Sequence, residues 1–247
     1  MTTKYLTGFL AKDLSHAGPA TRTTGEKLFQ RGFALVQWPW LLKSLYGGTK
    51  AQKAALLERV GLEGDALPHL GSWKADTYLL HRIVDEIEAR HPQIVMELGS
   101  GATSLVIAKA LSLHGGGCLH SYDQHKPFVR QMGEWLTEHE LAARFYHAPL
   151  GQRDPAWPGL WYDLPEIPSV IDMLIIDGPP WAVHPFARGM AECLFDRVAP
   201  GGIVMLDDAA RPGERIVARR WRRKWSDFDF TFEGGGTKGL LIGRKGR

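Results

Sequence analysis

The chain has 247 residues, of which 44% are hydrophobic, with a formal net charge of +3 and a pI near 8.8. This length suits one α/β domain with an extension, and so small a net charge does not by itself indicate a nucleic-acid partner. The two cysteines, Cys118 and Cys193, form no motif, and no apolar run approaches the roughly 18 residues of a membrane span. We therefore expect a cytoplasmic protein with reduced thiols, no secretory signal and no membrane-spanning segment.

Residues 1–72 are predicted to form a helical, aromatic-rich extension. Aromatic side chains are frequent between residues 28 and 45, Gly47-Gly48 breaks the chain, and residues 51–60 have the pattern of a short helix. Such an extension suits a lid over the main domain or the interface of a homodimer. A helix lying on a membrane surface is disfavoured, because Pro39 interrupts the stretch and its basic residues are few.

Residues 73–247 are predicted to alternate between strands and helices. Short apolar runs predict strands at 94–96, 118–123, 144–150, 170–176 and 203–206. Apolar residues at helical spacing predict helices over 74–90, 103–113, 128–139, 186–198 and 217–225. Residues 151–168 show no period and favour a loop. Phenylalanines that alternate with polar residues from Phe228, followed by a second run at 239–244, predict a terminal antiparallel hairpin.

This alternation indicates an α/β fold with a mostly parallel sheet covered by helices on both faces, which the hairpin makes mixed. Ligands of such sheets bind beyond the carboxyl ends of the strands. A polar residue stands at the end of each predicted strand before the hairpin, and these residues are Glu97, Asp123, His147, Asp177 and Asp207-Asp208. Their convergence is the strongest indication of a functional site.

The turn after the first predicted strand has the sequence Gly99-Ser100-Gly101, and Thr103 or Ser104 opens the next helix. A glycine turn before a helix presents backbone N–H groups to a ligand, and Asp123 suits the two hydroxyls of a ribose. A dinucleotide or an adenosyl ligand would fit these features. The adenosyl sulfonium fits better, because Glu97 would repel a pyrophosphate and Ser104 stands where the dinucleotide fingerprint has Gly or Ala.

Four motifs carry a family resemblance: residues 97–101, Asp123, residues 175–178 and residues 200–208. In order and spacing they resemble the class I S-adenosylmethionine-dependent methyltransferases, and most of all the branch with small-molecule O-methyltransferases. The resemblance covers residues 73–247. It implies a Rossmann-like, doubly wound sheet of seven strands, the cofactor S-adenosylmethionine, and methyl transfer as the activity.

The resemblance also implies roles for individual residues around the cofactor. Asp123 and the adjacent Gln124 would hold the ribose, and Asp177 would lie near the sulfonium and the acceptor. His147 and Ala148 stand where the family contacts adenine, although the acid or amide often found there is absent. The methionine part would be lined by Glu97, Gly99, Ser100, Gly101, Thr103 and Ser104, and the pocket would be closed by Trp73, Lys74 and Tyr78.

The acids Asp177, Asp207 and Asp208 resemble the three-ligand metal site of catechol-type O-methyltransferases, which implies Mg²⁺ or Mn²⁺. The sequence departs from that pattern at Asp208, where the family usually has asparagine, and at Pro180, where a lysine base is expected. The alternative is that Asp207 or Asp208 caps the following helix and hydrogen-bonds the substrate. The catalytic candidates are Asp177, Asp207 and His184, which is either a general base or a structural histidine.

The favoured function is transfer of a methyl group to an oxygen of a small molecule such as a sugar, a phenol or a natural-product intermediate. A second hypothesis is an RNA or protein methyltransferase that uses the basic helix following Asp208, although a solvated helix face is the simpler interpretation. No motif for exocyclic base amines or cytosine C5 is present, which disfavours nucleic acid. A third hypothesis is a non-catalytic cofactor-binding or assembly protein. The basic residues are Arg211, Arg215, Arg219, Arg220, Arg222, Arg223 and Lys224.

Overall fold

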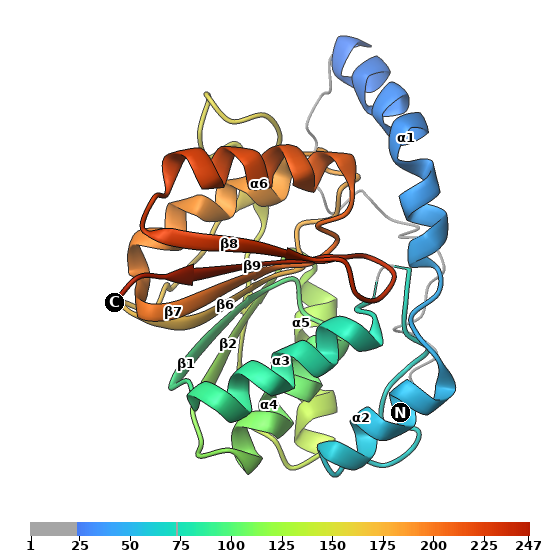
Figure 1. Ribbon diagram of the computed structural model, residues 1–247, viewed down its shortest axis with the longest axis vertical. Helices are drawn as coiled ribbons and strands as arrows, with labels where there is room; N and C mark the ends of the chain where they lie inside the picture. The colour runs from blue at the N-terminus through green and yellow to red at the C-terminus, as the bar shows by residue number, and fades with distance from the viewer. Residues whose placement is uncertain (1–23, 73) are drawn as a thin grey trace.

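The computed structural model describes residues 24–72 and 74–247, and in this part of the chain seven strands form one central sheet (Figure 1). The strand order is β3-β2-β1-β6-β7-β9-β8, with the first five strands parallel and β9 antiparallel to both of its neighbours. The mostly parallel sheet with an antiparallel C-terminal hairpin is therefore confirmed. The strands are β1 (Ile94–Leu98), β2 (Cys118–Asp123), β3 (Arg144–His147), β6 (Ile171–Ile176), β7 (Val198–Leu206), β8 (Phe228–Glu233) and β9 (Leu240–Lys245).

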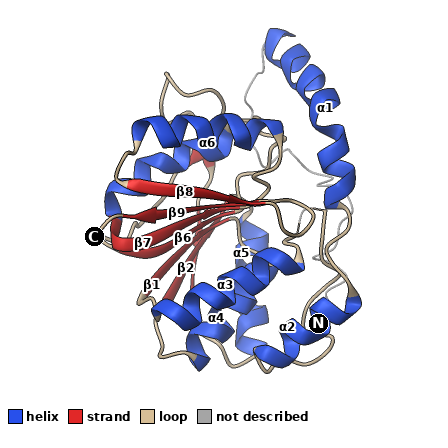
Figure 2. Cartoon of the chain, viewed as in Figure 1, coloured by secondary structure: helices blue, strands red, loops and turns tan. Residues whose placement is uncertain are grey.

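Helices cover both faces of this sheet (Figures 1 and 2). One face carries α3 (Thr77–Arg90), α4 (Ala102–Leu113) and α5 (Lys126–Glu138), and the other carries the 3₁₀ helix η3 (Ala187–Arg197) and α6 (Pro212–Lys224). Alternate residues of one strand point to opposite faces of the sheet. Val95 therefore packs in the core beneath α3, α4 and α5, while Met96 and Leu98 pack in the core beneath η3 and α6. This burial on both sides explains why the central strands contain the apolar runs 94–96, 173–176 and 203–206.

The turn between β8 and β9 is fastened to the start of α3. Asp76 caps α3 by accepting a hydrogen bond from the Leu79 N–H at 2.9 Å. Its second carboxylate oxygen accepts from the backbone N–H of Thr237 at 2.8 Å and from the Thr237 hydroxyl at 3.1 Å. One buried acid thus fixes the position of the C-terminal hairpin over the carboxyl ends of the parallel strands.

Several predicted elements differ in the structure. The strand predicted at 144–150 ends at His147, and Leu150 belongs to a separate two-stranded sheet. The predicted loop at 151–168 contains a short strand, β5 (Trp161–Tyr162), which pairs antiparallel with β4 (Leu150–Gly151). Strands of two residues are too short to show a period. The strand predicted at 203–206 begins already at Val198, which pairs with Ile171; the register then shifts across residues 199–202, and regular pairing resumes at Ile203 opposite Met173. The helix predicted at 186–198 is a 3₁₀ helix that ends before Val198.

The described part of the N-terminal extension is helical, as predicted. It consists of α1 (Thr24–Ser44), which continues through Pro39, and α2 (Lys50–Arg59), which begins with a capping box of Thr49 and Gln52. α2 places Leu56 in the core beneath α3, whereas α1 projects from the body (Figure 1). Among the helices of residues 24–72 and 74–247, none combines the length and the apolar character needed to cross a membrane.

Candidate functional site at the carboxyl edge of the sheet

The glycine turn after β1 is held close to the end of β6. Gly99 donates its N–H to the Tyr122 carbonyl at 2.8 Å and has a φ of +93°. A Cβ at Gly99 would lie 2.8 Å from the backbone nitrogen of Gly178, which is closer than real Cβ contacts allow. Gly101 differs, because its φ of 170° is ordinary extended backbone and a Cβ there would have nothing within 4 Å. The two glycines therefore have different physical reasons to be glycine.

This difference gives a testable prediction. Gly99→Ala should destabilise the cofactor-free protein by roughly 1–3 kcal/mol, since it combines a left-handed φ with a backbone clash. Gly101→Ala should leave the melting temperature of the cofactor-free protein nearly unchanged and should weaken S-adenosylhomocysteine binding, because only a ligand would meet the added methyl. Thermal melting together with calorimetric titration measures both effects. Equal destabilisation by the two substitutions would contradict this interpretation of the turn.

Glu97 is buried at the end of β1 with one oxygen satisfied and one available. Its Oε2 accepts hydrogen bonds from the hydroxyls of Ser104 and Ser121, both at 2.5 Å. Among the described residues, Oε1 has no hydrogen-bond partner. Burial raises the pKa of the Glu97 carboxyl to about 7, although the hydroxyls of Ser104, Ser121 and Thr103 favour the ionised form. A buried acceptor without a partner is a site at which a donor of a ligand would be stabilised.

Asp123 is likewise buried, at the end of β2, and accepts the His125 N–H at 2.8 Å. Burial raises the pKa of its carboxyl to about 7. Ala148 donates its N–H to the Asp123 carbonyl at 2.9 Å, and the His147 ring nitrogen Nε2 lies 3.2 Å from the Gln124 carbonyl. The side-chain oxygen of Gln124 has no partner within the described ranges. The structure thus brings together the residues predicted to surround the adenosyl group.

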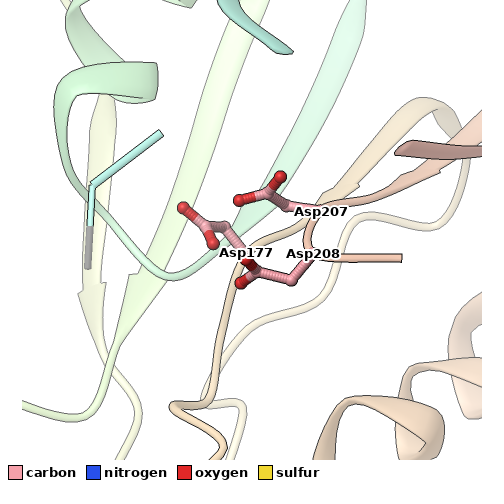
Figure 3. Close-up of side chains that lie close together, drawn as sticks. All are labelled: Asp177, Asp207 and Asp208. Carbon is pink, nitrogen blue, oxygen red and sulfur yellow. The ribbon is translucent and has the colours of Figure 1, made fainter. Parts of the chain in front are cut away.

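Asp177, Asp207 and Asp208 meet at the ends of β6 and β7. Their side-chain oxygens include a set of three that all lie within 4.8 Å of one another, and Figure 3 shows the three side chains gathered from the two strand ends. The side chains of Asp207 and Asp208 are only 2% exposed, whereas that of Asp177 is 12% exposed. Asp177 is therefore the member of the cluster that a bound molecule reaches most easily.

Three buried cations surround this acid cluster, and the sequence did not indicate any of them as part of it. Arg188 from η3 contacts Asp208 Oδ2 at 2.9 Å and Asp177 Oδ1 at 3.2 Å. Lys238 Nζ lies 3.0 Å from Asp207 Oδ2 and 3.6 Å from Asp208 Oδ1. Arg211 Nη2 lies 2.8 Å from Asp208 Oδ1, in an ion pair without hydrogen-bond alignment.

The cations act unequally on the three acids. Burial would raise the pKa of Asp208, but Arg211, Lys238 and Arg188 outweigh burial and lower it to about 2. Burial dominates at Asp177 and raises the pKa of its carboxyl well above the ordinary value, with the neighbouring charge of Asp207 adding to the effect. The cluster therefore contains one firmly ionised acid and one acid with increased basicity.

A divalent ion does not fit this cluster well as it stands. Mg²⁺ requires oxygen ligands at about 2.0–2.1 Å in octahedral geometry, and each of the three acids already has a cation bound to one of its oxygens. The alternative prediction, a helix cap by Asp207 or Asp208, is wrong: α6 is capped at Arg211 without a side-chain hydrogen bond. Asp208 instead accepts the Arg211 N–H with its backbone carbonyl at 2.9 Å.

His184 lies in the loop between β6 and η3. Its Nδ1 accepts the Phe186 N–H at 3.1 Å, and its ring stacks on Phe29 of α1 with the ring centroids 5.6 Å apart. The ring is therefore in contact with the N-terminal extension, and the general-base role stays a prediction. Two of the residues predicted to close the pocket have hydrogen-bond partners within the fold: Tyr78 donates to Glu233 at 2.9 Å, and Lys74 donates to the His69 carbonyl at 3.0 Å. Trp73 lies outside the described residues.

Tyr162 of β5 is a candidate that sequence reasoning missed, because it lies in the segment predicted to be a loop. Its hydroxyl is buried and has no hydrogen-bond partner in the described part of the chain. A Cβ added at Gly178 would lie 2.1 Å from this hydroxyl, so Tyr162 packs directly on the backbone beside the glycine turn. It stands between the adenosyl residues and the acid cluster.

The basic face of α6 is partly used within the fold. Arg220 and Lys224 each contact Glu192 Oε1 at 2.8 Å, and the Arg220 guanidinium lies 4.7 Å from the centre of the Trp157 ring. Arg211, which was counted with this face, is buried at the acid cluster. These contacts explain part of the basic run without a nucleic-acid partner, while Arg215, Arg219 and Arg223 are exposed.

Comparisons with known proteins agree with this geometry. Residues 96–209 match the model of a family described as a methyltransferase domain. An O-methyltransferase from Bacillus cereus in complex with SAH is similar in structure, with a TM-score of 0.54 and 11% identity over 87% of this chain and 99% of that one. An SAH-bound methyltransferase from Podospora anserina gives a TM-score of 0.55 and 9% identity over 93% and 100% of the two chains.

A methyltransferase from Geobacter sulfurreducens is also similar, with a TM-score of 0.51 and 18% identity over 80% of this chain and 87% of that one. A search of curated proteins found no match. Residues 96–209 therefore match a methyltransferase domain, and the strand order and the glycine turn agree with the predicted resemblance to the class I S-adenosylmethionine-dependent methyltransferases. The predicted resemblance to the methyltransferases is thereby confirmed, and the cofactor stays a prediction.

Proposed function

We propose that the chain transfers the methyl group of S-adenosylmethionine to an oxygen of a small-molecule acceptor. The observation that carries the proposal is the pair of buried carboxylates, Glu97 and Asp123, beside a glycine turn, with an acid cluster at the next two strand ends. Three of the similar solved structures have TM-scores above 0.5 and are described as an O-methyltransferase, a putative caffeoyl-CoA O-methyltransferase and a putative O-methyltransferase, which supports an oxygen acceptor.

The cofactor would lie along the ends of β1, β2 and β3. Glu97 would accept from the α-amino group through Oε1, and the backbone of the turn would contact the methionine carboxylate. Asp123 would accept from the ribose hydroxyls and Gln124 would hydrogen-bond the same part of the cofactor. Further contacts are proposed for Ser100, Thr103, Ser104, His147 and Ala148.

Methyl transfer is an in-line displacement in which positioning supplies much of the rate. An acceptor hydroxyl must also lose its proton, and Asp177 is the proposed base because it is the most accessible acid of the cluster. Burial raises the pKa of Asp177 and so increases its basicity. Asp207 would hydrogen-bond the acceptor or hold Asp177 in place.

The N-terminal extension is proposed to form a wall on the acceptor side. Gln30 of α1 donates to the Val183 carbonyl at 2.8 Å, and Phe33 packs edge-on against Phe186 with centroids 5.6 Å apart. These contacts, with the stacking of Phe29 on His184, attach α1 to the loop that follows Asp177. This attachment would suit a lid formed by α1 over the acceptor side of the site. Several apolar side chains of α1 are exposed, including Leu28, Leu35 and Trp38, and they would suit the interface of a homodimer. The homodimer stays a prediction.

The test is a transfer assay with methyl-labelled cofactor and a panel of sugars, phenols and catechols. Asp177→Asn should lower kcat by about 10²–10⁴-fold while S-adenosylhomocysteine still binds. Asp163→Asn is the matched control, because Asp163 forms an exposed ion pair with Arg153.

Unchanged turnover in Asp177→Asn would remove this residue from the mechanism. Label that enters RNA or protein instead of the panel would favour the second hypothesis, and its salt sensitivity would then be measured. Cofactor binding without label transfer to any acceptor would favour the non-catalytic hypothesis.

A further inference from the structure

We propose that Lys238 takes the place that a divalent cation would hold beside Asp207 and Asp208, so that this methyltransferase works without a metal ion. The ammonium group lies between the two neighbouring carboxylates, 3.0 Å from Asp207 Oδ2 and 3.6 Å from Asp208 Oδ1. The Lys238 side chain is 1% exposed. The compact ammonium charge of Lys238, held between two carboxylates, is therefore more similar to a bound metal ion than to an ordinary exposed lysine.

The backbone holds Lys238 in this position. Its carbonyl accepts the Ala210 N–H at 3.0 Å, and the next carbonyl, of Gly239, accepts the Ala209 N–H at 3.0 Å. Both donors belong to the turn that begins with Asp207-Asp208. On the other side, Thr237 is fixed by its two hydrogen bonds to Asp76. The turn that carries the lysine and the turn that carries the acids are therefore bound to each other, and the ammonium is positioned before any ligand arrives.

The charges around the cluster leave little attraction for a further cation. Asp177, Asp207 and Asp208 face Lys238, Arg188 and Arg211, so the three carboxylates of the cluster are matched by three cations. A fourth buried acid, Glu214, interacts with Arg188 and Arg211 from outside the cluster. A divalent ion would have to approach the ammonium to within a few ångströms, where like charges repel strongly inside a protein. It would also have to compete with the ion pair that each of the three carboxylates already forms.

The consequence for the reaction concerns the charge on the acceptor. Negative charge that develops on an acceptor oxygen beside Asp177 would be stabilised by the fixed charges of Lys238 and Arg188. Lys238 contacts the carboxylates of Asp207 and Asp208 and not the acceptor itself, so it is a positioning residue. The inference rests on the proposed function for the nature of the acceptor, whereas its test measures ion binding and needs no acceptor.

The experiment titrates Mn²⁺ into the 247-residue chain saturated with S-adenosylhomocysteine, and electron paramagnetic resonance reports the free ion. Wild type should show no stoichiometric binding. Lys238→Gln removes the charge but keeps a polar side chain, and it should gain one site per chain, at least about tenfold tighter than any wild-type binding. Adding Asp207→Asn to this variant should abolish the new site. Lys50→Gln, an exposed lysine of α2, is the control.

One Mn²⁺ bound per chain in wild type, lost in Asp208→Asn, would overturn the proposal. A folded Lys238→Gln that binds no ion would also overturn it, because Lys238 would then not be what occupies the cation position. If Lys238→Gln does not fold, the wild-type titration alone decides between metal and lysine. Turnover of wild type in EDTA is a second readout: a loss of activity that Mn²⁺ restores contradicts the proposal, whereas absence of turnover under all conditions concerns the proposed function instead.

Discussion

Glu97→Ala is expected to weaken the binding of S-adenosylhomocysteine by roughly 10- to 100-fold at pH 8, with the fold retained. The buried Oε1 is the acceptor that a cationic amine would use, and a charge-assisted hydrogen bond of this kind contributes about 1.5–3 kcal/mol. The loss should appear in the affinity and much less in the melting temperature of the cofactor-free protein. Isothermal titration measures the affinity, and Glu138→Ala on the exposed end of α5 is the control.

The affinity for S-adenosylhomocysteine is also expected to depend on pH. The pKa values of Glu97 and Asp123 are raised to about 7, so the cofactor-free protein holds protons on both carboxyls below that pH. Because ligand donors need ionised carboxylates, affinity should rise between pH 6 and 8. The free energy of unfolding of the cofactor-free protein should instead fall as the pH rises. The contribution of Glu97 and Asp123 to it is fully present below their unfolded pKa values near 4 and is lost as the pH rises through about 7.

Glu97→Gln separates the contribution of the hydrogen-bond acceptor from that of the ionised carboxylate. It keeps a carbonyl acceptor but cannot titrate, so it should bind more weakly than wild type at pH 8 and show a flatter pH profile, with only the Asp123 dependence left. An unchanged affinity in Glu97→Ala, or a wild-type affinity that falls from pH 6 to 8, would contradict the proposed place of the α-amino group.

Much of the fold followed from the sequence because parallel strands are buried on both faces. Residues 94–96 and 173–176 are continuous apolar runs, followed directly by Glu97 and by Asp177, so both the strand and the ligand-facing residue could be located. The carboxyl ends of parallel strands share one edge of the sheet, and that geometry predicts the meeting of Asp177 with Asp207 without any knowledge of contacts.

The counter-ions of the cluster could not be found in this way. Lys238 stands in a glycine-rich turn and is separated by 31 residues from Asp207, its nearest acid. Its pattern is that of an ordinary exposed hairpin turn. Arg211 was grouped with a basic helix face although it precedes the helix and is buried. Burial of a charged side chain depends on tertiary packing, which no local period records.

Arg188→Met is expected to cause the largest loss of stability among the site variants, about 3–5 kcal/mol, because it breaks a buried ion pair from one side. Arg188 contacts the carboxylates of Asp177 and Asp208 and also donates to the carbonyls of Asp177, Pro179 and Asp207. Methionine has a similar shape but leaves these acceptors without a donor. Thermal melting should show a decrease of roughly 6–20 °C for a domain of this size.

Exposed Arg223 on α6 provides the matched control, and Arg223→Met should change the melting temperature little. The pH dependence identifies the cause of the loss. In wild type the pKa of Asp208 is lowered to about 2, so its contribution to stability is present above the unfolded value near 4 and is lost only as the pH falls through about 2. Without Arg188 the pKa of Asp208 rises toward its unfolded value near 4, so the deficit of the variant should be largest at about pH 7 and shrink toward about pH 3. A deficit that is equal at both pH values would assign the role of Arg188 to its contacts with the backbone carbonyls, because only the carboxylates change their charge over this range.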